Sequence, residues 1–268
     1  MDNLEIKIVT ESAVNLQDKD WINIEKLILE FPINSKSTHN NNEFRNKEYF
    51  KNKLLNSPSG SCYVTRAIDK FGNFLGLQTL TRKNFFNSGK KTTSFELGDV
   101  YVHPKLQGKS IYFRILKDSI LFLEKNFKFA FVYATANQLS QPWLIRGGFK
   151  LIDYQLNFNI LPIRPYLIFK IKFFKKLFLF INPIYIFLIR IYLYALSINM
   201  PFQFNLINDF KGFPEEHKPN HDIELDRSYD YLQWRYIENP HSYEIYKINL
   251  KNDYIGYAIF RKAKYQVF

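Results

Sequence analysis

Apolar and polar residues alternate along several short stretches of the first half of the chain, which is the pattern of half-buried β-strands. Two longer stretches have apolar residues at helical spacing: one begins near Asp20, whose carboxylate suits a helix start, and runs through Ile28. The second covers Asn42–Leu55. Polar loops are predicted at 34–42 and 84–93. The predicted strands are Glu5–Thr10, Cys62–Ile68 and Phe74–Thr81, the last two joined by a turn containing Gly72.

A strand, a turn and a helix follow one another between Glu96 and Tyr112. The strand ends before Pro104, which has no amide hydrogen to donate to a neighbouring strand. The loop Gln107-Gly108-Lys109-Ser110 then opens into a helix, and backbone N–H groups at a helix start lack partners within the helix. Such a loop is typical of a phosphate site. The predicted buried face of the helix carries Ile111, Ile115, Leu116, Ser119 and Ile120.

A second motif follows at a fixed distance. Phe129–Ala134 has the composition of a buried strand, and Asn137 comes directly after it. A short helix is predicted next, closed by Gly147-Gly148-Phe149. A further strand is predicted over Leu151–Ile160.

In this order, the two motifs resemble those of the GNAT superfamily of acyl-CoA N-acyltransferases over about residues 5–160. The family's pyrophosphate loop, Gln/Arg-x-x-Gly-x-Gly/Ala after Val-x-Pro, is matched by Val102-His103-Pro104 and by 107–112. Ser110 replaces the middle glycine, and Tyr112 replaces the last small residue. A serine can still cap a helix, whereas a tyrosine adds bulk where a ligand must approach the backbone.

The resemblance implies an α/β (α+β) fold with a mixed central sheet flanked by helices. It also implies an N-acetyltransferase that uses acetyl-CoA as co-substrate and a small primary amine, by analogy an amino sugar, as acceptor. The diphosphate would rest on the N–H groups from Gly108 to Tyr112, and the pantetheine arm would follow the preceding strand. The cofactor-binding residues implied in this way are Tyr101, Val102, Gln107, Gly108, Lys109, Ser110, Ile111, Tyr112 and Asn137.

A general base is needed because the attacking amine must lose a proton. Glu96 and Asp99 are the only acids on the strand that leads to the loop, and Asp99 is the preferred candidate, with a sheet-edge charge or a substrate anchor as its alternative roles. Many relatives protonate the leaving thiolate with a tyrosine at the place of Leu144. A thiol has a pKa of roughly 8 to 9 and leaves readily without such help. Tyr101 and Tyr133 are either alternative proton donors for the thiolate or residues that pack on the sheet.

The segment Pro165–Phe202 is strongly apolar, but Asn182-Pro183 and Arg190 interrupt it. Its longest apolar run is shorter than the roughly 18 to 20 residues of a membrane span. Three interpretations stay open for it: a buried helical connector, which is favoured, an amphipathic surface for peripheral membrane contact through 165–202, and a membrane span.

The C-terminal part begins with a polar linker over 208–222 and continues with a helix at Asp226–Tyr236. Strands at Tyr243–Leu250 and Tyr254–Arg261 form a predicted hairpin. This order resembles the opening of a second GNAT unit without the cofactor strand and loop. The expected domains are a GNAT-like domain at 1–162, an apolar helical connector at 163–207 and a partial second GNAT-like unit at 208–268.

Composition adds less to this picture. The chain has 268 residues and a formal net charge of +12, which favours anionic partners such as the phosphates of CoA. The single cysteine, Cys62, forbids an internal disulfide and is expected to be a core thiol in a reducing cytoplasm. The first residues carry no secretory signal pattern. No metal site is expected, because Pro219 separates His217 from His221 and no cysteine pair is near.

Two alternatives to the acetyltransferase stay open. The first is an aminoacyl-tRNA-dependent aminoacyltransferase of cell-wall synthesis, in which the positive charge would hold the tRNA. The second is a catalytically inactive GNAT-like binding module, suggested by Ser110, Tyr112 and Leu144. The favoured interpretation has no nucleic-acid partner.

Overall fold

The computed structural model describes residues 5–30, 46–137, 139–152, 172–199, 201–211 and 222–261. The chain divides into two compact units, each built from two separate parts of the sequence. The larger unit combines Met1–Leu151 with Asp209–Ser242, and the smaller combines Ile152–Asn208 with Tyr243–Phe268. The consecutive division at 162 and 207 stays a prediction.

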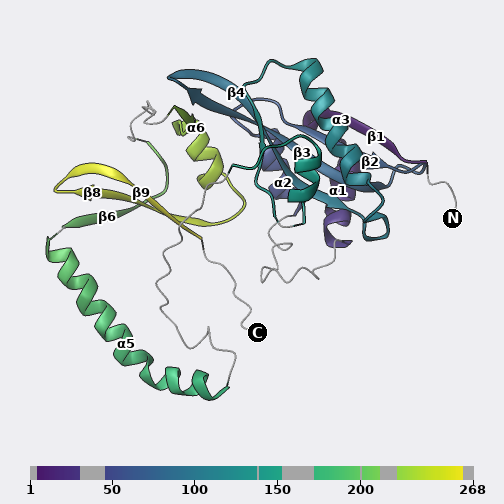
Figure 1. The fold of residues 1–268 in the computed structure, drawn as a ribbon. Helices are drawn as coiled ribbons and strands as arrows, with labels where there is room; N and C mark the ends of the chain where they lie inside the picture. The colour runs from purple at the N-terminus through teal and green to yellow at the C-terminus, as the bar shows by residue number, and fades with distance from the viewer. Residues whose placement is uncertain are drawn as a thin grey trace. The chain divides into compact units, whose positions relative to one another are not determined.

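A mixed sheet forms the centre of the larger unit, as the sequence predicts (Figure 1). Its strands lie in the order β1-β2-β3-β4-β5, and β7 pairs with β3 beyond the end of β2. The pairs from β1 to β4 are antiparallel, whereas β4 and β5 are parallel. The strands are β1 (Lys7–Ser12), β2 (Tyr63–Ile68), β3 (Phe74–Asn87), β4 (Lys90–Val102), β5 (Val132–Ala134) and β7 (Ile223–Leu225).

The predicted loop at 84–93 is wrong. There β3 continues to Asn87 and β4 begins at Lys90, so the two strands form one long hairpin. Ser88 and Gly89 make its turn with φ angles of 49° and 77°, the left-handed pair that a tight two-residue hairpin needs. Thr92 and Phe85 face one another across the hairpin, and such β-branched and aromatic pairs stabilise a sheet although the stretch is polar on average.

Helices cover both faces of this sheet. Helices α1 (Asp18–Glu30) and α2 (Lys47–Leu55) pack on one face through a buried cluster that includes Trp21, Phe50 and Tyr101. Asp20 lies inside α1, and its carboxylate accepts a hydrogen bond from the N–H of Gln17 at 2.9 Å, which ties down the chain before the helix. A short 3₁₀ turn, η1 (Ala13–Asn15), joins β1 to α1.

Helix α3 (Ile111–Asn126) covers the opposite face, together with the short α4 (Gln141–Arg146). Its buried residues include the predicted Ile111, Ile115, Leu116 and Ser119, with Leu123 completing the face and Ile120 partly buried. The Ser119 hydroxyl bonds to Thr65 Oγ1 at 2.7 Å and to Gln78 Oε1 at 3.1 Å. These buried bonds fix α3, and therefore the loop at its start, against β2 and β3.

The C-terminal segment of the larger unit contains the predicted helix, as α6 (Tyr229–Leu232) followed by one π-helical turn, η5 (Gln233–Ile237). The strand predicted at Phe129–Ala134 is shorter than expected and begins at Val132. Leu151 and Ile152 are not in a strand, and the rest of the strand predicted to end at Ile160 lies outside the described residues. The predicted loop at 34–42, His217 and His221 also lie outside them.

The smaller unit contains helix α5 (Lys172–Asn199) and an antiparallel sheet of β6 (Phe202–Ile207), β8 (Tyr243–Leu250) and β9 (Asp253–Arg261). The predicted hairpin of β8 and β9 is confirmed, and Lys251 and Asn252 make its turn with φ angles of 52° and 73°. Strand β6 was not predicted, because its residues had been assigned to the helical connector at 163–207.

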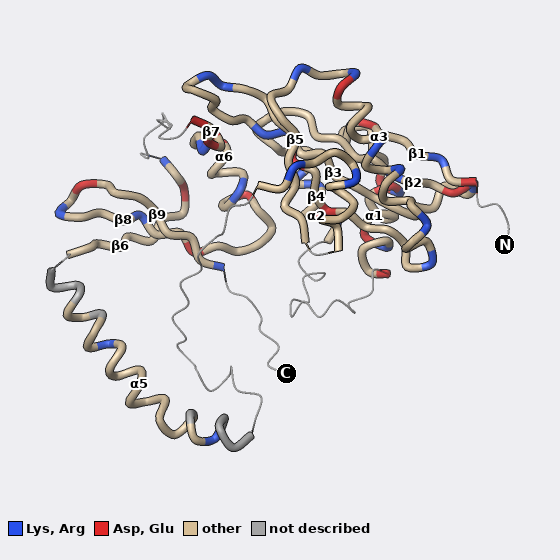
Figure 2. The backbone as a smooth tube through the Cα atoms, viewed as in Figure 1, with Lys and Arg blue, Asp and Glu red and all other residues tan. Residues whose placement is uncertain are grey.

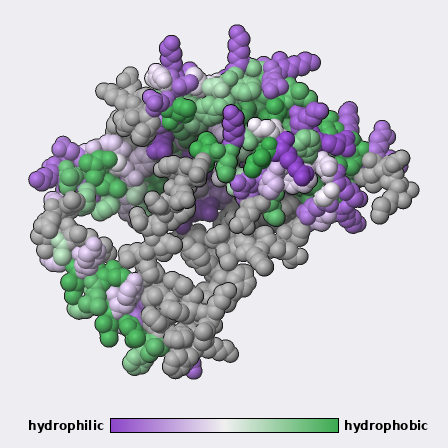
Figure 3. Space-filling view, viewed as in Figure 1, coloured by the Kyte–Doolittle hydropathy of each residue, from purple (hydrophilic) through white to green (hydrophobic). Residues whose placement is uncertain are grey.

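Helix α5 is exposed, so the expected burial of the connector is wrong. Phe180 is 88% exposed, and other large apolar side chains along α5 are exposed as well (Figure 3). Figure 2 shows basic but no acidic residues on α5. Over the described residues, no helix combines the length and the apolar character that crossing a membrane requires.

Candidate functional site

The parallel strands β4 and β5 part near the middle of the sheet. They pair at Phe95–Val132, Glu96–Tyr133 and Leu97–Ala134, and β4 then continues to Val102. Just beyond this pairing, Asp99 has a φ of 46° and the register between β3 and β4 shifts, which marks a β-bulge. A bulge bends its strand and increases the local twist, and this one lies just beyond Ala134, where β5 ends and the pairing stops.

The loop between β4 and α3 presents unpaired amides at a helix start. A 3₁₀ turn, η3 (Pro104–Leu106), leads into it, and the N–H groups of Gln107 and Lys109 donate to Pro104 and Leu106 at 3.3 and 3.2 Å. Within the described residues, no hydrogen bond uses the N–H groups of Gly108, Ser110, Ile111 and Tyr112. Free amides at the positive end of a sixteen-residue helix fit an anionic group such as a diphosphate.

The two departures from the family loop are accommodated locally. Ser110 adopts a left-handed φ of 58°, the conformation that a glycine takes more easily. The Tyr112 ring packs between two buried clusters, and burial raises the pKa of its hydroxyl to about 12. Its bulk therefore lies in the core, and the space around Gly108 stays open, since a Cβ there would have no neighbour within 4 Å.

Other predicted cofactor residues shape this loop. The Gln107 side chain donates to the carbonyl of Val102 at 3.3 Å, which ties the loop to the end of β4. Val102 and Tyr101 are buried, with Val102 in the same cluster as Ile111. The Lys109 side chain is exposed. The Asn137 side chain accepts from the N–H groups of Leu139 and Ser140 at 3.0 and 2.9 Å, so it organises the start of α4.

Asp99 is buried and already paired. Its carboxylate is in a salt bridge with Lys53 of α2 and accepts a hydrogen bond from the Thr79 hydroxyl at 3.1 Å. Burial alone lowers the pKa of Lys53, but the charge of Asp99, followed by Tyr49 and Glu96, outweighs burial and raises it above 10.5. Lys53 is therefore a permanent ammonium, and a carboxylate held by such a partner is a poor proton acceptor.

Glu96 is the more accessible of the two predicted acids. Its side chain is 27% exposed, against 5% for Asp99. It stands on β4 beside Tyr133 of β5, at the point where the parallel pairing nears its end. Its carboxylate lies 3.6 Å from Lys83 Nζ. Glu96 therefore combines an ionic neighbour with a route to solvent or substrate.

Lys83 is a buried lysine under aromatic rings from the C-terminal segment. Its side chain is 5% exposed, and Nζ lies 5.3 Å from the ring centre of Tyr231 and 5.0 Å from that of Trp234. Burial, reinforced by the positive charges of Arg235 and Lys53, lowers its pKa to about 8, although Glu96 opposes this. Trp234 is buried and is not an exposed stacking platform.

The residues around a leaving thiolate differ from the family pattern. Leu144, at the place of the usual tyrosine, is buried in the cluster beneath α3. Tyr133 lies among the rings of Phe85 and Phe131, and burial, with Glu96 and Tyr231, raises the pKa of its hydroxyl well above 10. Tyr101 packs in the cluster beneath α1. Tyr133 is therefore a neutral phenol, and it is the residue of β5 that pairs with Glu96 of β4.

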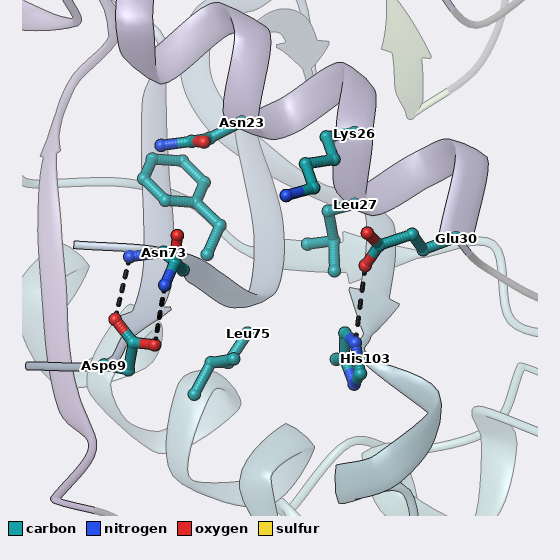
Figure 4. A pocket seen from close by; sticks show the side chains of 9 residues that line it. Asn23, Lys26, Leu27, Glu30, Asp69, Asn73, Leu75 and His103 are labelled. Carbon is teal, nitrogen blue, oxygen red and sulfur yellow. Dashed lines mark hydrogen bonds and ion pairs between the residues drawn. The ribbon is translucent and has the colours of Figure 1, made fainter. Parts of the chain in front are cut away.

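A separate pocket of about 220 Å³ lies between α1 and the start of β3 (Figure 4). Glu30 reaches across it to His103 Nε2 at 3.3 Å, and Asp69 is held by the turn that contains Asn73. This pocket shares no lining residue with residues 107–112 or with the surroundings of Glu96. His103 lines this pocket and caps the η3 turn that precedes residues 107–112.

Two further expectations concern cysteine and metal chemistry. Cys62 is 1% exposed, and burial raises the pKa of its thiol, so it is a core residue as expected. Within the parts of the chain that the structure describes, no three His, Cys, Asp or Glu side chains gather in a group that could hold a metal ion.

Sequence reasoning missed the roles of Lys53, Lys83 and the aromatic pair Tyr231 and Trp234. Lys83 did carry a signal, because it follows Leu77, Thr79 and Thr81 at two-residue spacing and therefore faces the covered side of β3. A lysine at such a position must have partners. No local pattern shows that these come from residues about 150 positions later.

No protein-family model matches the chain, and neither does any curated protein. Solved structures do match its fold. A conserved protein of unknown function from Enterococcus faecalis, described as a probable N-acyltransferase, is 13% identical with a TM-score of 0.57. The alignment covers 96% of this chain and 56% of that one, so the chain spans little more than half the length of its relative. This likeness shows the fold, which is GNAT-like.

Two further solved structures match somewhat more than half of this chain. A predicted acetyltransferase with acetyl-CoA from Clostridium acetobutylicum is 17% identical, with a TM-score of 0.43 over 58% of this chain and 96% of that one. A GNAT family acetyltransferase from Brucella melitensis in complex with acetyl-CoA is also 17% identical, with a TM-score of 0.38 over 55% and 84%.

Proposed function

We propose that this protein transfers an acyl group, with acetyl as the first candidate, from a CoA thioester to a primary amine by direct attack within a ternary complex. The observation that carries the proposal is the set of unpaired N–H groups at Gly108, Ser110, Ile111 and Tyr112, placed after the part of β4 that continues beyond its pairing with β5. The order of strand, amide loop and helix is the one that the GNAT-like fold uses.

In this proposal the amide loop holds the diphosphate of acetyl-CoA, and the pantetheine arm follows β4 beyond Leu97. The bound co-substrate supplies an activated thioester. Glu96 accepts the proton that the amine must lose, directly or through water, because it is partly exposed while Asp99 is committed to Lys53. Asn137 shapes the start of α4 through its Oδ1, and its place among the cofactor-binding residues stays a prediction. An acyl-CoA-dependent reaction fits the cytoplasm, where CoA is available.

Isothermal titration calorimetry with acetyl-CoA tests the loop. Gly108→Pro is the perturbing variant, because proline removes one amide donor and cannot adopt the φ of 79° found there. Gly89→Pro is the matched control, since Gly89 also lies in an exposed turn with a φ of 77° and open space around its Cβ. We expect at least tenfold weaker binding for Gly108→Pro and unchanged binding for Gly89→Pro. Equal affinity for parent and Gly108→Pro would overturn the loop assignment.

Turnover tests the chemistry separately. A panel of primary amines, including amino sugars, is assayed with acetyl-CoA by release of the free thiol. Glu96→Gln should bind acetyl-CoA as the parent does and lose most of its turnover. Binding without turnover across the panel would favour the inactive module. Salt-sensitive tRNA binding without CoA binding would favour the aminoacyltransferase.

The proposal includes peripheral contact between α5 and an anionic membrane surface. Exposed apolar side chains recur at three- and four-residue spacing along one side of this helix. Lys176 and Arg190 are fourteen positions apart, which places them together on a neighbouring side, and the helix contains no acid. This distribution is typical of a helix lying in a bilayer interface. The apolar residues are Leu177, Phe180, Ile181, Ile184, Phe187, Leu188 and Ile191.

Vesicle co-sedimentation tests this contact with neutral phosphatidylcholine and with a phosphatidylcholine–phosphatidylglycerol mixture. We expect binding to the anionic vesicles and its loss in the double variant Ile184→Asp with Phe187→Asp. Leu121→Asp is the control, because Leu121 is equally exposed on α3 but lies outside the stripe. Absence of vesicle binding, or a concentration-dependent dimer that the double variant abolishes, would show that lipid is not the partner.

A further inference from the structure

The C-terminal segment is fastened over one face of the central sheet at both of its ends. At its start, the N–H of Asp226 donates to the carbonyl of Asn84 at 2.9 Å, and its carboxylate lies 2.7 Å from Lys91 Nζ. At its end, the side chain of Asn52 in α2 donates to the carbonyl of Glu238 at 3.0 Å. The segment from Asp226 to His241 is therefore a fixed part of the larger unit.

Trp234 is held in the middle of this segment. Its ring nitrogen donates to the carbonyl of Asn52 at 3.0 Å, and its ring packs against that of Tyr231 with centres 5.7 Å apart. Both residues are buried. Because their positions are fixed from two sides, the ring faces that meet Lys83 have little freedom to move.

These rings restrict where the Lys83 ammonium can go. A lysine side chain has four flexible carbons and usually reaches for solvent. Here Tyr231 and Trp234 close the route outward, and the oxygen of Glu96 lies 3.6 Å from the ammonium. An ammonium over aromatic faces is attracted by the negative faces of the rings, which offsets part of its desolvation. The ion pair with Glu96 supplies a further part.

We propose that Tyr231 and Trp234 hold Lys83 against Glu96, and that this contact fixes the orientation of the Glu96 carboxylate. The inference rests on the proposed role of Glu96 as proton acceptor. Lys83 is then a positioning residue, since it acts through Glu96 and not on the substrate. The C-terminal segment becomes part of the reaction site, although it follows the cofactor loop by more than a hundred residues.

Several other groups surround the pair and enter its titration. Lys53 of α2 and Arg235 of η5 are positive, while Tyr133 of β5 and Tyr231 of α6 are phenols whose pKa values burial raises. Cys62, which precedes β2, is a buried thiol. Near neutral pH the phenols and the thiol are uncharged, and the two other cations keep their charge. Removal of Lys83 therefore changes one charge beside Glu96 and leaves the rest as they are.

The first experiment reads the ionisation of Glu96 without relying on turnover. The protein is labelled with ¹³C at glutamate carboxyls, and the Glu96 signal is assigned by its absence in Glu96→Gln. We expect the midpoint of this signal in a pH titration to change in Lys83→Met and in Trp234→Leu, because both variants remove or displace the ammonium beside the carboxylate. Lys83→Arg should retain the parent midpoint. A midpoint that is the same in all variants would overturn the proposal.

The second experiment reads the consequence for the reaction. Trp234→Leu and Lys83→Met should bind acetyl-CoA within twofold of the parent, show kcat lowered about tenfold, and have the acid limb of their pH profile moved upward. Trp143→Phe is the control, because Trp143 also meets a cation, Arg146 at 5.3 Å, but on α4. Parent-like kcat and an unmoved acid limb in both variants would overturn the proposal. Loss of acetyl-CoA binding by the parent would overturn the proposed function, while the carboxyl titration would still decide the contact.

Discussion

Replacing Lys83 with methionine should stabilise the protein at neutral pH. The buried ammonium has a pKa of about 8, against 10.5 when it is free in water. At about 1.4 kcal/mol for each pH unit between the two values, its burial costs roughly 3 kcal/mol at pH 7. Methionine has a similar unbranched shape and no charge to desolvate. Glu96, which loses its partner, is 27% exposed and can be hydrated.

The sign of the pH dependence follows from the same two values. Between pH 8 and 10.5 the unfolded chain still holds the Lys83 proton and the folded protein does not, so the stability of the parent rises with pH in this range. The advantage of Lys83→Met should therefore shrink from roughly 3 kcal/mol at pH 7 to about 1 kcal/mol at pH 9.5. Cys62 has a raised pKa because it is buried, and it opposes this trend above pH 9.

Urea unfolding at pH 7.0 and pH 9.5, followed by tryptophan fluorescence, measures both quantities. Lys53→Met is the matched control, because Lys53 is a second buried lysine on the same face of the sheet, and its pKa is raised rather than lowered. It should destabilise by about 3 to 5 kcal/mol, since it leaves Asp99 buried without its cation. A Lys83→Met protein that is less stable than the parent, or an advantage that does not change with pH, would refute the reasoning.

Three further predictions follow from single residues. Ser110→Gly should raise the free energy of unfolding by about 0.5 to 1 kcal/mol and keep acetyl-CoA affinity, because glycine adopts the left-handed φ of 58° without strain; reduced stability in urea unfolding would contradict this. Asp99→Asn should lower the unfolding free energy by about 3 kcal/mol, since Lys53 loses its counter-ion, while calorimetry shows acetyl-CoA binding intact; an unchanged midpoint in urea would speak against the buried pair. Leu116→Ala should cost about 2 to 5 kcal/mol in thermal or urea unfolding, because Leu116 is fully buried beneath α3; a cost below 1 kcal/mol would mean that this cluster is loosely packed.

Local sequence patterns predicted the fold correctly where the structure of an element depends only on its own residues. The face of α3 follows from apolar spacing alone, and the hairpin of β8 and β9 follows from two alternating runs around a short turn. The pattern failed at 84–93, where average polarity hid a strand pair with its turn at Ser88 and Gly89. The prediction that α5 is buried was also wrong. An apolar composition indicates that a segment is removed from water, but it does not show that the protein itself covers the segment.

The loop at 107–112 was predictable for a different reason. Its chemistry depends on backbone groups at a helix start, and a sequence that ends a strand and begins a helix fixes where those groups lie. The positions of acids and bases depend on side chains that meet across elements. Lys53 and Asp99 are 46 positions apart, and Lys83 and Trp234 are about 150 apart, so no spacing rule connects them.

The choice between Glu96 and Asp99 shows what decides such a site. In a regular strand, residues 96 and 99 point to opposite faces, because side chains alternate. The bulge at Asp99 shifts this alternation, so both acids lie on the face that carries α2, one beside Lys83 and the other beside Lys53. The two lysines then separate their roles. The salt bridge buries Asp99 and occupies its carboxylate, whereas the rings above Lys83 leave Glu96 at the boundary of the covered surface with part of its side chain accessible. One backbone irregularity and one distant aromatic segment therefore determine which of the two acids stays partly exposed.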